Sequence, residues 1–215
     1  MNKNGIIYPN VKLGKNYRLD TGVILGFSED VENKDVTNIG KNAIFRVYTV
    51  VCAGVKIGDN FQTGPNVFIR EDNIIGNEVV VWHSATISLG NVIGDGCRIH
   101  AGSFLELVTL GKRVFIGPNV VFADDPHPVN PSPRTCFGGA VVEDEAVIGA
   151  NVTVLPHVRI GRKAVVGAGS TVTKNIPAGE VWVGNPAKFL KRVEDVVCNV
   201  EGKKHYPYKE YWNIK

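Results

Sequence analysis

Every sixth residue of this chain is apolar over most of its length. From residue 39 to residue 105 the spacing holds without a break, and only Thr63 is not a large apolar residue. The series reads Ile39, Phe45, Val51, Ile57, Thr63, Ile69, Ile75, Val81, Ile87, Ile93, Ile99 and Leu105. A helix repeats about every 3.6 residues and a strand about every two, so neither alone gives this period. It indicates a repeated unit of six residues.

The same spacing continues in three other phases, over residues 7–25, 110–122 and 142–172. Leu105 and Leu110 are separated by one residue less than the period requires, so the repeat slips there. Residues 27–38 and 123–141 break the pattern and are polar or proline-rich. We therefore expect two loops that leave a regular stack and then return to it.

One short strand and one turn fill a unit of six residues. The apolar residue of each unit then points inward and stacks on its counterpart one coil away. Neighbouring coils satisfy each other's backbone hydrogen bonds, as in a parallel sheet. The 24 glycines of the chain suit a fold with this many turns. The alternative is a sandwich of short strands, but there the turns recur irregularly, at about eight to twelve residues.

Composition excludes several classes of protein. Hydrophobic residues make up 44% of the chain and charged residues 21%, which is typical of one folded domain rather than a disordered chain. The net charge of +3 comes without a basic run, so we expect no nucleic-acid partner. No apolar run reaches the roughly 18 residues of a membrane span. The four scattered cysteines and the lack of an apolar leader favour free thiols in the cytoplasm.

Three stretches of the sequence resemble the hexapeptide-repeat acyltransferases. Residues 148–193 contain the segments VTKNIP and VGNPAK, which look like the end of sugar and amino-sugar acetyltransferases. Residues 51–69 and 115–125 are similar to nucleotide-sugar N-acetyltransferases, and HPVNPSPR at 127–134 resembles the maltose, galactoside and xenobiotic acetyltransferases. The resemblance implies an all-β fold, a left-handed parallel β-helix with three faces per coil.

The same resemblance implies an activity and an assembly. It implies an acetyl-CoA-dependent acetyltransferase that acts on an amino sugar, preferably nucleotide-linked, or on a sugar hydroxyl. It also implies a homotrimer, with acetyl-CoA between two adjacent β-helices and no metal. Two alternatives remain open: a zinc enzyme like the γ-carbonic anhydrases, with His83 and His100 as first ligands, and a non-catalytic scaffold subunit.

Three faces give eighteen residues per coil, so residues that far apart should be neighbours. Arg70, Ser88 and Glu106 then form a ladder that continues, after the slip, at Ala123. The loop 123–141 should therefore leave the stack beside Glu106. His83 and His100 are expected on the preceding face. We expect the histidines and the carboxylate to gather along one side.

Transfer of an acyl group from a thioester needs a base that takes a proton from the attacking amine or hydroxyl. His127 matches the motif in which the sugar acetyltransferases place their catalytic histidine; the alternative is a loop histidine packed between two prolines. His100 is a second candidate, and Glu106 is the candidate partner that orients the base. We expect the substrate to be bound by Arg134, Asp125 and His83, although Arg134 also suits a simple ion pair within the loop.

The coenzyme residues come from the resemblance. The matching positions are Ala150, Ala168, Thr173, Lys174, Arg162 and Lys163. Small side chains would let the pantetheine arm approach the backbone, and the cations would meet the phosphates; solvated surface charges are the alternative. The family's usual tryptophan is Val147 here, and His157 stands where a glycine is usual.

The repeat ends near residue 185. We expect one β-helix domain over residues 1–185, with its loops at 27–38 and 123–141, and a separate segment over 186–215. Pro186 is suited to the first turn of a short C-terminal helix that caps the last coil. The aromatic tail that follows is expected to pack on the outside of the stack or on a neighbouring subunit, and His205 within it has no expected function.

Overall fold

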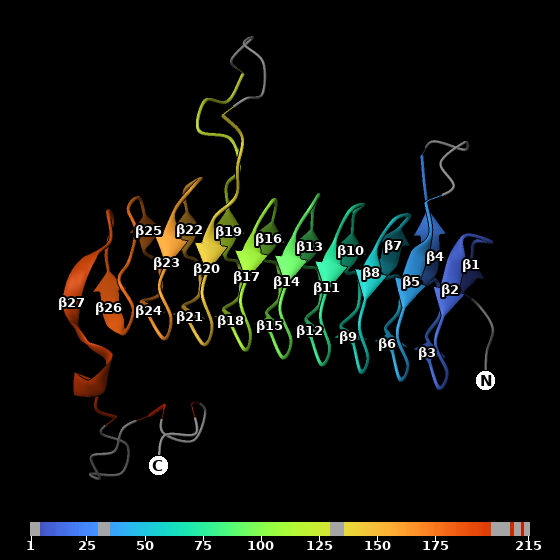
Figure 1. Cartoon of the computed structure of the whole chain (residues 1–215), viewed down its shortest axis with the longest axis horizontal. Helices are drawn as coiled ribbons and strands as arrows, with labels where there is room; N and C mark the ends of the chain where they lie inside the picture. Colours follow the sequence, from blue (N-terminus) through green and yellow to red (C-terminus); the bar gives the residue numbers. More distant parts are fainter. Residues whose placement is uncertain (1–4, 30–34, 130–135, 199–206, 209–211, 213–215) are drawn as a thin grey trace.

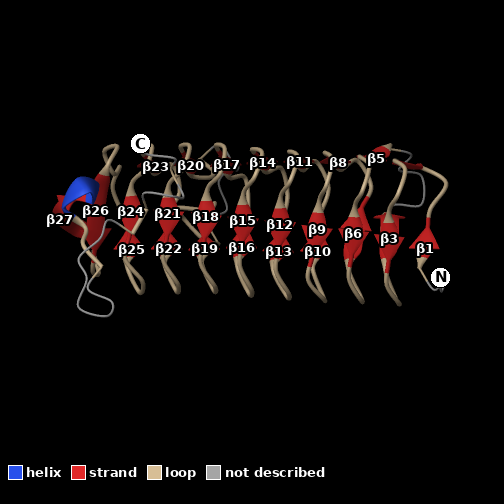
Figure 2. Cartoon of the chain, turned by 90° about the horizontal axis from the view of Figure 1, so that it is seen from below, coloured by secondary structure: helices blue, strands red, loops and turns tan. Residues whose placement is uncertain are grey.

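The chain winds into a long three-sided prism (Figure 1). This computed structural model describes residues 5–29, 35–129, 136–198, 207–208 and 212. Within them the strands form three flat sheets that run the length of the prism (Figure 2). We call the nine-stranded sheet A, the eight-stranded sheet B and the ten-stranded sheet C. Successive strands pass from A to B to C, so each full coil contributes one strand to every face.

The strands are short because a turn follows almost immediately. Sheet A contains β1 (Ile6–Ile7), β4 (Ile24–Phe27), β7 (Val50–Cys52), β10 (Phe68–Ile69), β13 (Thr86–Ile87), β16 (Phe104–Leu105), β19 (Val121–Phe122), β22 (Thr153–Val154) and β25 (Thr171–Val172). Sheet B contains β2 (Val11–Leu13), β5 (Thr37–Ile39), β8 (Lys56–Ile57), β11 (Ile74–Ile75), β14 (Val92–Ile93), β17 (Thr109–Leu110), β20 (Val141–Val142) and β23 (Arg159–Ile160).

Sheet C contains β3 (Arg18–Leu19), β6 (Ile44–Phe45), β9 (Gln62–Thr63), β12 (Val80–Val81), β15 (Arg98–Ile99), β18 (Phe115–Ile116), β21 (Val147–Ile148), β24 (Val165–Val166), β26 (Glu180–Val183) and β27 (Lys188–Arg192). All pairs are parallel except that of β26 with β27. The predicted loops are confirmed as interruptions between β4 and β5 and between β19 and β20. Both rise from the edge where sheet A meets sheet B (Figure 1).

The register confirms the predicted coil. Ile57 pairs with Ile75, and Ile75 pairs with Ile93, so the inward residues of sheet B lie one above the other. At the slip the pairing shortens by one residue, because Ile93 pairs with Leu110. The inward residues form one continuous buried core. Burial of this apolar surface is the main source of stability, at about 25 cal/mol per Å².

Thr63, the exception in the apolar series, is buried at its inward position. Its hydroxyl lies 2.9 Å from the hydroxyl of Thr49 and accepts a hydrogen bond from the backbone N–H of Arg46 at 3.0 Å. A buried hydroxyl is tolerated when it is hydrogen-bonded. The polar interruption therefore costs the core little.

The turns bring backbones close together. A Cβ added at Gly94 would lie 2.5 Å from the carbonyl oxygen of Gly111, so no larger residue fits there without a shift. Other turn residues adopt left-handed backbone angles, for example Asn119 with φ 56° and His157 with φ 61°. Asparagine, aspartate and histidine are the non-glycine residues that tolerate this region best.

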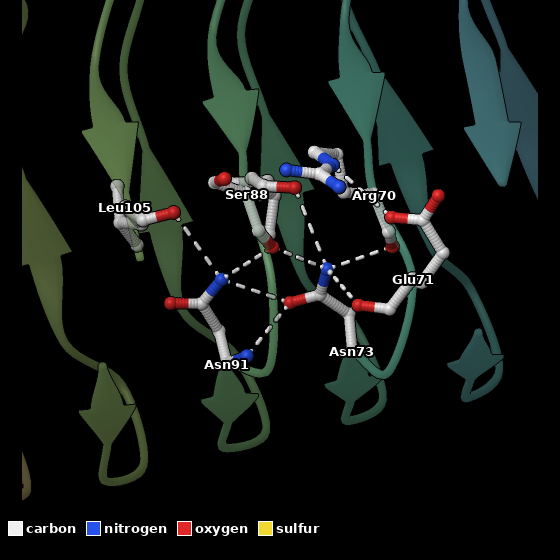
Figure 3. A network of polar contacts seen from close by, with 7 residues as sticks. Arg70, Glu71, Asn73, Ser88, Asn91 and Leu105 are labelled. Carbon is white, nitrogen blue, oxygen red and sulfur yellow. Dashed lines mark hydrogen bonds and ion pairs between the residues drawn. The ribbon is translucent and has the colours of Figure 1, made fainter. Parts of the chain in front are cut away.

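Two buried asparagines link successive coils at the edge between sheets A and B (Figure 3). The side-chain oxygen of Asn73 accepts hydrogen bonds from the backbone N–H of Asn91 at 3.0 Å and from its Nδ2 at 2.9 Å. The side-chain oxygen of Asn91 in turn accepts the backbone N–H of Val108 at 2.9 Å. These two residues, which we call the asparagine ladder, thus extend the hydrogen bonds of this corner into the coil that is shorter by one residue.

The predicted helix after Pro186 is wrong. The chain turns back instead, and β27 pairs antiparallel with β26 at the end of sheet C. A single 3₁₀ turn, η1 (Val193–Asp195), follows. The last parallel strand leaves unpaired backbone groups at the sheet edge, and pairing them outweighs a weak local preference for helix. Ala187, directly after Pro186, is buried against the core.

The described tail residues pack on the outside of sheet C, as predicted. Trp212 is buried against Val165, Val181 and Val193. Its indole Nε1 donates a hydrogen bond to the carbonyl oxygen of Glu145 at 2.9 Å, and the ring of Tyr208 stacks on it with centroids 4.6 Å apart. In the part of the chain that the structure describes, no helix is long and apolar enough to cross a membrane.

Candidate functional site

The second loop begins where β19 ends and returns at β20. Its two arms are tied at the base, because the N–H of Gly138 donates to the carbonyl oxygen of Asp124 at 2.9 Å. The edge from which it rises is shared by the ladder predicted from the sequence. Glu106 directly follows β16, which pairs with β19, so this carboxylate lies one coil before Ala123. The predicted placement of the loop beside Glu106 is therefore confirmed.

His127 lies exposed on the outgoing arm of this loop. Its backbone N–H donates to Oδ1 of Asp125 at 2.8 Å, and its ring Nδ1 lies 3.5 Å from Sγ of Cys136 on the returning arm. Within the described residues no hydrogen bond or ion pair joins His127 to Glu106. Asp125, which we predicted to bind substrate, accepts a hydrogen bond from the loop backbone through its Oδ1. Arg134 and His205 lie outside the described residues.

His157 was not recognised from the sequence as part of this site. It occupies the same prism edge one coil later, and its Nε2 donates to the carbonyl oxygen of Cys136 at 2.8 Å. A Cβ at Gly138 would overlap the ring of His157, so the loop packs closely over the imidazole. The signal in the sequence was the histidine that replaces a glycine in a turn. Its backbone is left-handed, with φ 61°, a conformation that glycine adopts freely and that histidine tolerates.

His100 lies at the other edge of sheet A, where sheet C ends. Its ring stacks on Trp82 with centroids 5.4 Å apart and contacts Phe115 at 4.8 Å. Burial, assisted by the charge of Arg98, lowers the pKa of His100 below its ordinary value. The lower pKa favours the neutral imidazole, which is the form that a general base must have.

The expected gathering of three histidines does not occur within one chain. The strand β16 spans sheet A between His100 and Glu106, so the two edges of this sheet carry different candidates. His83 also differs from its predicted place. Trp82, rather than His83, occupies the row of His100, and the carbonyl oxygen of His83 accepts the N–H of Gly102 at 3.2 Å. Counting residues predicted the coil correctly, but it placed His83 beside His100, where Trp82 lies one residue earlier in the sequence.

The small residues expected to hold the coenzyme lie on the edge of His100. A Cβ added at Gly149 would lie 2.6 Å from the backbone nitrogen of Ala168, which shows that Ala150 and Ala168 belong to consecutive coils of one corner. At these two positions only a methyl group projects from the corner. Thr173 and Lys174 are exposed at the opposite edge, in the row of Ala123.

The other two predicted phosphate ligands are ion-paired within the chain. Arg162 and Lys163 contact Oε2 of Glu145 at 3.2 and 3.6 Å, and Arg113 contacts Oε1 of the same carboxylate. The side chain of Glu145 is only 4% exposed. Burial opposes its ionisation, but hydrogen bonds from the two arginines and the charge of Lys163 hold the pKa of this carboxyl below its usual value. This cluster anchors the tail, since Trp212 bonds to the Glu145 carbonyl oxygen.

Similar proteins are known for both sequence and fold. Residues 139–174 match the family model described as bacterial transferase hexapeptide (six repeats), and residues 73–106 match hexapeptide repeat of succinyl-transferase. A putative acetyltransferase of Schizosaccharomyces pombe is 32% identical over 157 residues, which cover 65% of this chain and 76% of that protein.

Two further relatives are longer than the part they share. The bifunctional protein GlmU of Clostridioides difficile is 28% identical over 86% of this chain and 38% of its own length. A 2,3,4,5-tetrahydropyridine-2,6-dicarboxylate N-acetyltransferase of Staphylococcus aureus is 41% identical over 41% of this chain and 34% of its own length. The chain thus matches little more than a third of each of these two relatives.

Solved structures with this fold include two acyltransferases. The UDP-N-acetylglucosamine acyltransferase from Campylobacter jejuni has a TM-score of 0.74 at 18% identity, covering 89% of this chain and 74% of that one. LpxA, the UDP-N-acetylglucosamine acyltransferase from Bacteroides fragilis, has a TM-score of 0.72 with the same identity and coverage. At this identity the likeness concerns the fold alone, and it confirms the predicted left-handed parallel β-helix.

Proposed function

Because the chain belongs to the hexapeptide-repeat family of acyltransferases, we propose that it transfers an acetyl group from acetyl-CoA to a sugar. The acceptor is an amino sugar, preferably nucleotide-linked, or a sugar hydroxyl. The observation that carries the proposal is the exposed imidazole of His127. It is held on a loop whose arms are hydrogen-bonded to each other at the base and whose returning arm is hydrogen-bonded to His157 of the prism. A base must be accessible to a bound acceptor and still be fixed in place.

In this reaction His127 takes the proton from the attacking amine or hydroxyl. The acceptor then bonds to the thioester carbonyl carbon, and the thiol of coenzyme A leaves with the proton. A backbone N–H along the edge of Ala150 and Ala168 stabilises the negative charge on the carbonyl oxygen. Glu106 lies at the same edge as the loop and is the candidate group for orienting the acceptor or the base. His100 is the alternative base.

The positions of these residues support an assembly of several chains. Within one chain, Ala150 and Ala168 lie on one edge of sheet A, whereas Lys174 and the loop of His127 lie on the other. A cleft between two chains brings opposite edges together, so the proposed homotrimer completes the site. Acetyl-CoA would lie in that cleft, with Lys174 near its phosphates. Arg162 and Lys163 are less suited to this, because Glu145 already holds them.

The outer face of sheet A suits contact between copies. Its outward residues are uncharged and mostly apolar from one end to the other: Ile24, Val50, Phe68, Thr86, Phe104, Val121, Thr153 and Thr171. Phe68 and Val121 remain more than a third exposed in the single chain. Depletion of charge is characteristic of the core of a subunit interface. The predicted cytoplasmic location, where acetyl-CoA would be supplied, stays a prediction.

The test is acetyl transfer by the purified chain. The protein is incubated with acetyl-CoA and separate pools of amino sugars, UDP-linked amino sugars and galactosides, and acetylated products are detected by mass spectrometry. We expect product from one pool and a loss of about 100-fold or more in His127→Gln. His205→Gln, at the histidine with no expected function, is the matched control and should retain activity. Absence of any product, together with bound zinc in metal analysis or with no acetyl-CoA binding, would favour the metal enzyme or the scaffold instead.

A further inference from the structure

A sulfur atom faces the imidazole that we propose as the base. Sγ of Cys136 lies 3.5 Å from Nδ1 of His127, within the range of a hydrogen bond to sulfur. The two residues come from opposite arms of the loop and are fixed independently. The N–H of His127 is held by Asp125 at 2.8 Å, and the carbonyl oxygen of Cys136 is held by His157 at 2.8 Å. The two hydrogen bonds, one on each arm, therefore hold His127 and Cys136 where their side chains meet.

We propose that Cys136 is a positioning residue that selects the tautomer of His127. The ring N–H at Nδ1 donates to Sγ, and this leaves the lone pair on Nε2. The hydrogen bond of one imidazole nitrogen decides which nitrogen carries the proton. Nε2 lies on the side of the ring away from the sulfur and makes no hydrogen bond among the described residues. The inference rests on the proposed function, because the free lone pair matters only if His127 accepts a proton from the acceptor.

The other cysteines of the chain do not share this arrangement. Cys52 and Cys97 are buried, and burial raises the pKa of each thiol to about 12. Their sulfur atoms are sealed in the stack. Cys198 is half-buried, like Cys136, but belongs to the segment after η1 rather than to the loop. It therefore provides a matched control for any effect of removing a partly exposed thiol.

The first test reads the tautomer directly. The full chain is labelled with ¹⁵N-histidine, and the nitrogen shifts of His127 are measured near pH 9; His127→Gln identifies its signals. We expect the Nδ1–H tautomer in the unsubstituted protein and in Cys136→Ser, whose hydroxyl also accepts. Cys136→Ala should shift the population several-fold toward Nε2–H, and Cys198→Ala should not.

The second test reads turnover with the acceptor pool found above. Cys136→Ala should lower kcat about tenfold at an unchanged KM for acetyl-CoA, and Cys136→Ser should restore most of it. Circular dichroism verifies that both variants fold. An Nε2–H tautomer in the unsubstituted protein, or a tautomer indifferent to Cys136→Ala, overturns the inference. Because the spectra need no turnover, a correct tautomer without any acetyl transfer would refute the proposed function alone.

Discussion

The ring of His157 donates a hydrogen bond to the backbone carbonyl oxygen of Cys136, and this bond joins neighbouring coils at one edge of the prism. This contact holds the returning arm of the loop, and through it the neighbourhood of His127. We predict that His157→Asn, which tolerates the same left-handed backbone, lowers acetyl transfer about tenfold while the free energy of unfolding falls by only about 1 kcal/mol. Steady-state kinetics and urea unfolding check the two values. Acetyl transfer within about twofold of the unsubstituted protein would contradict a role of this contact in holding the loop.

The asparagine ladder predicts a site of large destabilisation away from the loop. Asn91→Ala removes the acceptor for the Val108 N–H and the side-chain donor to the Asn73 oxygen, both of them buried. The backbone donor of Asn91 remains, so we expect a loss of about 2–4 kcal/mol in the free energy of unfolding. Asn77→Ala, in an exposed ladder, is the control and should cost less than about 1 kcal/mol. Urea titration that ranked the two variants equally would refute the burial argument.

Glu145 predicts a specific loss of stability in acid. Its folded-state pKa lies below the usual value of 4.5, so its contribution is present above that pH and is lost as the pH falls through the folded-state pKa. In Glu145→Gln this part of the pH dependence should disappear, and the neutral-pH stability should fall because three cations lose their shared carboxylate. Unfolding measured between about pH 6 and pH 3 tests both effects. An unchanged acid profile in the variant would assign the dependence to other carboxylates.

Lys174 is the exposed cation that we expect coenzyme A to meet. Lys174→Glu should weaken binding of coenzyme A about tenfold or more and leave the midpoint of thermal unfolding unchanged, since the side chain is exposed. Isothermal titration with coenzyme A measures the affinity. Lys56→Glu, on the outside of sheet B, is the control for a general effect of charge. Equal weakening in both variants would mean that the proposed phosphate contact is misplaced.

The uncharged face of sheet A predicts the effect of adding charge. Val121→Asp should convert the proposed trimer to monomers at micromolar concentration, because a carboxylate would be buried without a partner at the interface. Val92→Asp on sheet B is similarly exposed and should leave the assembly intact. Sedimentation velocity distinguishes the species. Trimers that survive Val121→Asp would place the interface on another face.

The interior of the prism was predictable because every coil buries apolar residues at the same positions of its six-residue units. The stacking of Ile57, Ile75 and Ile93 and the shift at Leu110 both follow from counting residues. The hairpin of β26 and β27 was not predictable in this way, because it depends on the unpaired edge that the repeat leaves behind. Local sequence there favours neither structure strongly.

The candidate site was predictable only in part for a similar reason. The position of the loop beside Glu106 follows from the period, but the contacts of His157 and Cys136 depend on how an irregular segment folds back. The separation of His100 from His127 across sheet A reflects which corner each residue occupies, which periodicity alone did not resolve for His83. The ion pairs of Arg162 and Lys163 with Glu145 could not be predicted, because they depend on the buried position of that carboxylate.

The shortened coil at Leu105–Leu110 shows that a missing residue is absorbed at one corner, while the pairing on either side continues in register. Each coil touches only the coils before and after it, so changes in perimeter do not propagate. A loop inserted at a corner can therefore change in length or sequence while the β-helix keeps its structure. The loop that leaves the prism after Ala123 is attached in this way, because the coils on either side of it stay paired in register.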